Sequence, residues 1–142
     1  MKKRKISEFL RKVSVCVLLA AGVILYSNEN AQARRIGYMN KFTVYYGTGV
    51  NDEKFTDEQP KAVTNRDAVV NLADDSGTAW VTCTVRNSNN ESRGSTNLQR
   101  GTRKEFACTG QAYYNYKLGV RKTYDTGGGK VTINGSWSPD CK

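Results

Sequence analysis

The stretch that decides the fold spans residues 113–140 and reads YYNYKLGVRKTYDTGGGKVTINGSWSPD. Apolar or aromatic residues alternate with polar ones on both sides of its three glycines, which is the period of a half-buried strand. The apolar positions are Tyr114, Tyr116, Leu118 and Val120 before the glycines, and Val131, Ile133 and Trp137 after them. The pattern predicts a β-hairpin of residues 113–121 and 131–137. Its turn holds Gly127–Gly129, because glycine adopts positive φ without strain.

The period of two continues through the rest of the chain beyond residue 33, and no helical spacing of apolar residues is sustained there. Further strands are expected at residues 41–46, 67–73, 78–86 and 102–109. The sequence therefore predicts an all-β fold, a small antiparallel β-sandwich or barrel of about six strands. Residues 47–65 are expected to form a solvated loop. Their acids lack the spacing and central glycine of a calcium-binding loop, so no metal site is predicted.

Residues 1–33 have the three parts of a secretory signal peptide. Basic residues come first, an apolar run over residues 13–26 follows, and Ala31, Gln32 and Ala33 form a small-x-small cleavage site. The apolar run is shorter than the roughly 20 residues that span a bilayer as a helix. We therefore expect an N-terminal signal helix, cleavage after Ala33, and a single secreted β domain over residues 34–142. The alternative is an uncleaved anchor, with Arg34 and Arg35 as stop-transfer charges.

The chain contains no histidine, which excludes Ser-His-Asp and Cys-His nucleophile pairs and imidazole metal sites. Asp74 and Asp75 form the only adjacent acid pair in a turn-like context, DDSG, and a loop between two strands accounts for them. A pair of glycosidase-type acids would also need a substrate cleft. The sequence thus predicts a protein that is not an enzyme, with no catalytic residue, metal or cofactor.

Positive charge is concentrated in one part of the chain. The formal net charge is +9, and residues 81–122 hold eight basic residues against two acids. A positive surface attracts polyanions over long range, so an anionic cell-wall polymer or membrane surface is the expected partner. Nucleic acid is not, because export argues against it and the tyrosines that could stack bases fall mainly on the predicted core face. The predicted binding residues are Arg86, Arg103, Lys104, Lys117, Arg121 and Lys122. The alternative is a merely solvated face.

Removal of the signal peptide takes Cys16 away and leaves Cys83, Cys108 and Cys141. An odd number of cysteines in an exported chain allows one disulfide and one free thiol. A hairpin with Cys83 opposite Cys108 gives favourable cross-strand pairs, which predicts a Cys83–Cys108 disulfide and a free Cys141 that could join two copies covalently. The matching pairs are Val85 with Phe106, Arg86 with Glu105 and Thr82 with Thr109. Two alternatives stay open: Cys141 bridges back to one of the others, or all three stay reduced.

The run from residue 113 to residue 140, its tyrosine-rich strand and the Gly135-Ser136-Trp137 strand end resemble a family of small secreted Gram-positive proteins known only as a domain of unknown function. The resemblance covers about the last third of the chain and includes none of the three cysteines left after cleavage. It implies a secreted β domain and brings no catalytic residues.

Two function classes fit these observations. The first is a secreted, non-enzymatic binding or interaction protein whose basic face meets an anionic cell-envelope component or a partner protein. The second is an exported bacteriocin-like antimicrobial or toxin protein, since small cationic secreted domains can act on competing cells. The two differ in effect, because only the second should slow the growth of related bacteria.

Overall fold

The computed structural model describes residues 34–75 and 77–141, which fold entirely with β-strands and one short 3-10 turn. The all-β prediction is confirmed, whereas the expected signal helix lies outside the described residues. No helix in the described ranges is long and apolar enough to cross a membrane. The elements are β1 (Gly37–Tyr45), η1 (Val50–Asp52), β2 (Lys54–Phe55), β3 (Gln59–Pro60), β4 (Ala68–Leu72), β5 (Trp80–Arg86), β6 (Ser92–Gln99), β7 (Arg103–Phe106), β8 (Asn115–Lys122) and β9 (Lys130–Ser138).

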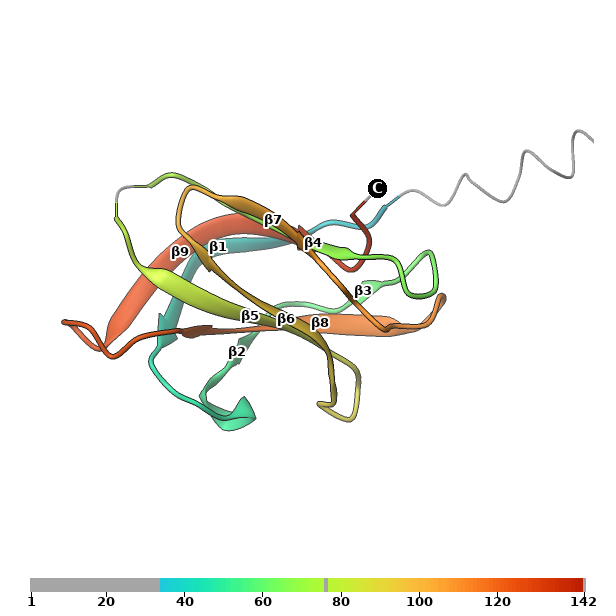
Figure 1. Cartoon of the computed structure of the whole chain (residues 1–142), viewed down its shortest axis with the longest axis horizontal. Helices are drawn as coiled ribbons and strands as arrows, with labels where there is room; N and C mark the ends of the chain where they lie inside the picture. Colours follow the sequence, from blue (N-terminus) through green and yellow to red (C-terminus); the bar gives the residue numbers. More distant parts are fainter. Residues whose placement is uncertain (1–33, 76, 142) are drawn as a thin grey trace, which may run out of the picture. The chain divides into compact units, whose positions relative to one another are not determined.

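The strands form two antiparallel sheets that enclose one core (Figure 1). One sheet has the order β1-β9-β4-β7, and the other has the order β2-β8-β5-β6 with β3 also paired to β8. Over the described residues the sheets do not close into a barrel, and there are nine strands, more than the six expected. The three that sequence reasoning missed are β2 and β3, which have two residues each, and the polar strand β6.

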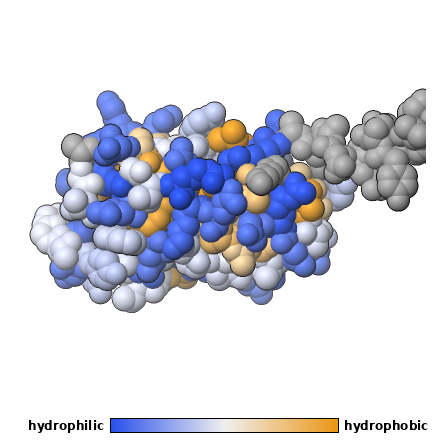
Figure 2. All heavy atoms as spheres, turned by 45° about the horizontal axis from the view of Figure 1, so that its top comes forward, coloured by the Kyte–Doolittle hydropathy of each residue, from blue (hydrophilic) through white to orange (hydrophobic). Residues whose placement is uncertain are grey.

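The apolar alternation around the three glycines correctly identifies core positions, with one exception. Tyr116, Leu118 and Val120 are buried, as are Val131, Ile133 and Trp137 beyond the turn. Tyr114 was expected on the same face but is 63% exposed, because β8 begins only at the next residue. On the face seen in Figure 2, hydrophilic side chains cover most of the surface and hydrophobic ones appear only as small patches.

The predicted hairpin is wrong, because β8 and β9 belong to different sheets. β8 pairs with β5, and β9 pairs with β1 and β4. The three glycines do adopt positive φ, at 40°, 69° and 63°, but their turn carries the chain from one sheet to the other (Figure 1). Alternation reveals that a strand has a buried face, whereas it does not specify which strand lies beside it.

A buried ion pair joins the segment after β3 to the segment after β9. The ammonium of Lys61 lies 3.4 Å from a carboxylate oxygen of Asp140, and both side chains are fully buried. Lys61 also donates to the carbonyls of Arg66 (2.6 Å) and Pro139, while Asp140 accepts from the amides of Ala62 and Val63. Residues 47–65 are therefore not simply the solvated loop that was expected, since they include strands and this buried lysine.

The predicted Cys83–Cys108 register is also wrong. Cys83 lies on β5 opposite Thr96 of β6 and Val120 of β8, whereas Cys108 follows β7 in the other sheet. Val85, Arg86 and Thr82 accordingly face Gly94, Ser92 and Asn97 on β6, and none faces its expected partner near Cys108. All three described cysteines, Cys141 included, are free. The sequence pattern did not reveal β6, because this strand is largely polar. β6, and not β7, is the strand that pairs with β5.

Replacing Lys61 with methionine should lower the free energy of unfolding by about 3–5 kcal/mol, because Asp140 would stay buried without a counter-charge. Chemical denaturation followed by circular dichroism measures the change. The control is Arg93→Met, which removes an ion pair with Glu91 that solvent largely reaches and should cost about 1 kcal/mol or less. Equal losses in the two variants would show that the buried pair has no special role.

Thiol labelling should separate the three cysteines. Desolvation raises the pKa of the Cys83 thiol strongly, and burial also raises the pKa of Cys108, so both should resist alkylation at neutral pH in the folded protein. Cys141 is partly exposed and should react first. Mass spectrometry of the iodoacetamide-treated native protein measures this order, and early labelling of Cys83 would contradict it. A denatured sample, in which all three sites label, is the control.

Candidate binding site

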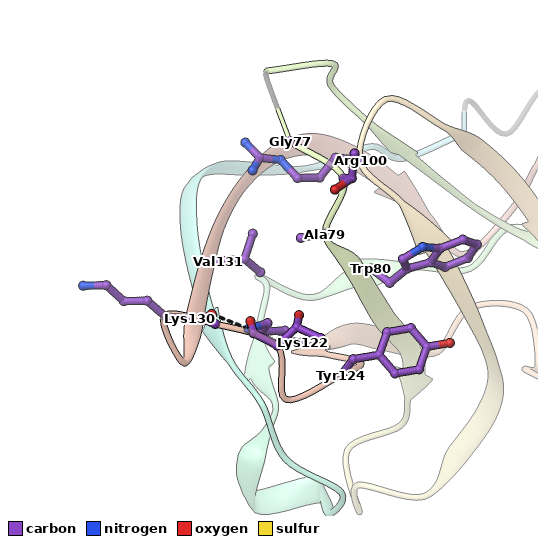
Figure 3. Close-up of a pocket in the computed structure, with 11 residues that line it drawn as sticks. Gly77, Ala79, Trp80, Arg100, Lys122, Tyr124, Lys130 and Val131 are labelled. Atoms are coloured by element: carbon purple, nitrogen blue, oxygen red, sulfur yellow. Dashed lines mark hydrogen bonds between the residues drawn. The ribbon is translucent and has the colours of Figure 1, made fainter.

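A cavity of about 580 Å³ opens at one end of the two sheets (Figure 3). Trp80 is the first residue of β5, Lys122 is the last residue of β8 and Lys130 is the first residue of β9. Strand ends from both sheets therefore line the cavity. Tyr124 comes from the segment between β8 and β9, and Arg100 comes from the tight turn after β6. This volume is within the roughly 300–1,000 Å³ of small-molecule pockets.

Two exposed aromatic side chains lie at the rim of the cavity. Trp80 is 41% exposed and Tyr124 is 53% exposed, and Figure 3 shows both rings on the same side of the opening. The amide of Thr123 donates to the carbonyl of Trp80 at 3.0 Å, which holds the two segments together. Such rings offer a ligand a flat apolar face and a polar edge.

Lys122 lines the cavity, and no acid among the described residues forms an ion pair with it. Its side chain is buried, and its ammonium donates to the backbone carbonyls of Thr126 and Gly127. Carbonyl groups satisfy N–H donors without neutralising the charge. An ammonium has three donors, so one remains beyond these two bonds.

The other two basic side chains differ in how they are held. The guanidinium of Arg100 binds one carboxylate oxygen of Asp75 through two nitrogens, at 2.8 and 2.6 Å. The ammonium of Lys130 has no ion-pair partner within the described ranges, and its side chain extends away from the cavity in Figure 3. None of the lining residues within the described part of the chain is acidic. The cavity therefore has a net positive lining.

Asp75 fixes Arg100 from outside the cavity. The hydrogen bond from Arg100 is the main cause that lowers the pKa of this carboxyl below 3.8, and a second bond from the Asn134 amide at 2.8 Å acts the same way. The earlier interpretation of the Asp74-Asp75 pair as part of a connecting loop agrees with this position. The ion pair with Arg100 gives the Asp75 carboxylate a structural role.

The structure does not bring the six predicted binding residues together. Arg103 and Lys104 lie on β7 at the edge of the four-stranded sheet, while the other four belong to the five-stranded sheet. Arg86 is engaged by Glu53, whose two carboxylate oxygens accept from it at 2.5 and 2.9 Å, and this bond raises the pKa of the guanidinium. Of the six, only Lys122 lines the cavity.

Lys117 and Arg121 do share the outward side of β8, as expected. Both are partly buried rather than free: Lys117 lies 4.3 Å from the centroid of the Phe55 ring, and Arg121 donates to the carbonyl of Gly47. The segment around η1 and β2 therefore covers much of this face.

Sequence reasoning missed Trp80, Arg100, Tyr124 and Lys130 as site residues. One signal was present, because Trp80 falls on the polar side of its strand, out of phase with Val81, Cys83 and Val85. An aromatic residue in that position has no place in the core.

Comparison of the chain with protein-family models, with curated proteins and with solved structures gives no match. Among the described residues, no group of three or more Cys, Asp or Glu side chains is placed to hold a metal ion. The function of the cavity is therefore inferred from its own residues.

Replacing Arg100 with glutamine should raise the pKa of Asp75 toward its ordinary value, because the largest cause of the lowering is removed. Carboxyl-carbon NMR during an acid titration measures it. A lowered folded pKa adds stability above the ordinary carboxyl pKa, and this stability is lost as the pH falls through the folded value. In Arg100→Gln, the part of the free energy of unfolding that comes from the lowered Asp75 pKa should be lost, so the stability of this variant should fall less as the pH is lowered. Arg93→Gln is the control, and an unchanged Asp75 titration in Arg100→Gln would contradict the assignment.

Proposed function

We propose that this chain is a secreted, non-enzymatic binding protein that holds an anionic component of the cell envelope at the cavity beside Trp80. The observation that carries the proposal is the lining: the buried Lys122, which has no ion-pair partner among the described residues, lies beside two exposed aromatic rings, and no described lining residue is acidic. A concave site with charge of one sign attracts and concentrates ligands of the other sign.

Lys122 supports an anionic ligand more strongly than a surface lysine would. Its ammonium is already held by two backbone carbonyls, so little side-chain freedom remains to be lost on binding. Because it is withdrawn from water, its interaction with a ligand charge is screened less than that of an exposed group. The side chain of Lys130 extends away from the cavity, so its charge contributes long-range attraction and not a direct contact.

The aromatic rings favour a ligand that carries apolar carbon-bound faces as well as negative charge. A cell-wall polymer of sugars or polyols joined by phosphates would place phosphate oxygens near the basic groups and carbon-bound faces on Trp80 and Tyr124. A bare inorganic anion would use only the first kind of contact. The signal-peptide pattern of residues 1–33 also supports this ligand class, since an exported protein meets such polymers. We therefore favour an anionic cell-wall polymer over the surface of a lipid bilayer.

The test uses the protein recovered from culture medium, where N-terminal sequencing should find Arg34 first. Sedimentation with isolated Gram-positive cell walls should weaken about tenfold or more in Trp80→Ala/Lys130→Glu, a change equal to about 1.4 kcal/mol. Walls stripped of their phosphate polymer should bind poorly, and added salt should reduce binding. Circular dichroism checks that the variants remain folded.

The matched controls change charge outside the cavity. The first control, Lys104→Glu, reverses a charge on β7. The second, Lys117→Glu/Arg121→Glu, reverses two charges on the outward side of β8. Neither should weaken binding as much as the cavity variant. If the β8 variant alone abolishes sedimentation, the ligand lies on the general basic face and the cavity proposal fails.

A further inference from the structure

A second, smaller cleft lies at the opposite end of β5 and β8 from the cavity. It is lined by residues that follow β5, by residues 109 and 111 ahead of β8, and by the start of β8 itself. Trp80 and Lys122 mark the cavity end of these two strands, whereas Asn87 and Asn115 mark the cleft end. β5 has seven residues, so the two sites are about 20 Å apart along the strand at roughly 3.3 Å per residue.

The cleft differs from the cavity in its chemistry, since uncharged amides and hydroxyls dominate it. Its amide side chains at Asn89, Gln111 and Asn115 are exposed and come from three separate segments. None of the three makes a side-chain hydrogen bond within the described part of the protein. The charge of Arg93, the one ionised side chain of the lining, is matched by Glu91 at 2.7 Å.

The backbone that carries these amides is firmly held. Tyr116 is buried beneath the cleft, and its hydroxyl accepts from the amide of Gln111 at 2.8 Å and bonds the carbonyl of the same residue. On the other wall the side-chain oxygen of Asn87 accepts from the backbone amides of Asn89 and Glu91. A site whose frame is ordered before binding loses less entropy when a ligand arrives.

Two exposed tyrosines stand next to these amides. Tyr114 lines the cleft and is 63% exposed, and its neighbour Tyr113 is 78% exposed. Tyr113 has φ of 69°, which is an outlier for a bulky residue. It is kept there by hydrogen bonds that its own amide (2.8 Å) and the carbonyl of Tyr114 (3.0 Å) make with the backbone of Lys61. Backbone strain of this kind tends to persist at functional sites.

We propose that this cleft is a second binding site, which takes a neutral oligosaccharide. A sugar hydroxyl both donates and accepts, and so does a primary amide, so the three exposed amides that line the cleft can bond hydroxyls of one ligand. The carbon-bound face of a sugar ring can pack on Tyr114. The absence of unmatched charge in the lining favours a neutral ligand over an anion. A volume of about 290 Å³ suits one ring of a chain.

The experiment is an NMR titration of the secreted protein with two probes, tri-N-acetylchitotriose and maltotriose, up to about 10 mM, which would reveal a Kd of about 1 mM. Either probe should shift the side-chain amide signals of Asn89, Gln111 and Asn115. Tyr114→Ala and Gln111→Ala should each weaken binding at least fivefold. The matched control is Asn97→Ala, which removes an exposed amide from β6 outside the cleft.

This site is independent of the proposed anion site, and the variants keep the two apart. Trp80→Ala/Lys130→Glu should leave oligosaccharide binding unchanged, so failure of cell-wall sedimentation would not affect this result. The proposal is overturned if neither probe shifts the cleft signals, or if binding persists unchanged in Tyr114→Ala with the fold intact. Shifts confined to Trp80 and Tyr124 would move sugar binding to the cavity and also overturn it.

Discussion

The buried pair of Lys61 and Asp140 is the interaction on which the arrangement of the cleft end of the domain depends. The side chain of Lys61 reaches the segment after β9, while its backbone extends the pairing of β3 with β8 as far as Tyr113 and Tyr114. Lys61 thus connects the segment after β9, in one sheet, with the residues that precede β8 in the other. A buried pair of this type gains little net stability over an apolar pair, but loss of one partner is costly because the other charge stays buried.

Two central strands separate the cavity from the smaller cleft. β5 and β8 are central in their sheet and buried along one side, so they act as a rigid spacer between the two ends. The loops at each end are then free to carry exposed aromatic and polar side chains, which is the usual division between scaffold and recognition. At one end lie Lys122 and Lys130, which have no ion-pair partner among the described residues, and at the other lie uncharged amides.

Much of the fold was predictable from local pattern, because a strand with one buried face alternates whatever its neighbours are. Six strands and core residues such as Leu118 and Ile133 follow from that period. Partner choice does not, which is why the β8–β9 hairpin and the opposition of Cys83 and Cys108 are wrong. The same limit applies to the site. In the sequence Arg86 resembles any other basic residue, because its partner Glu53 lies 33 positions earlier. Of the cavity residues, only Trp80 carried a signal in the sequence, since it is out of phase with the apolar residues of its strand.

The edges of the two sheets carry a further consequence. β7 is a four-residue strand at one edge, it contains Arg103, Lys104 and Glu105, and Lys104 donates to the carbonyl of Asn97 on β6, the edge of the other sheet. Short charged strands resist the addition of a strand from another molecule, which is the first step of edge-to-edge aggregation. Arg103 and Lys104, which suggested a binding face in the sequence, are thus also residues of the kind that keeps an open sheet edge from pairing with another molecule.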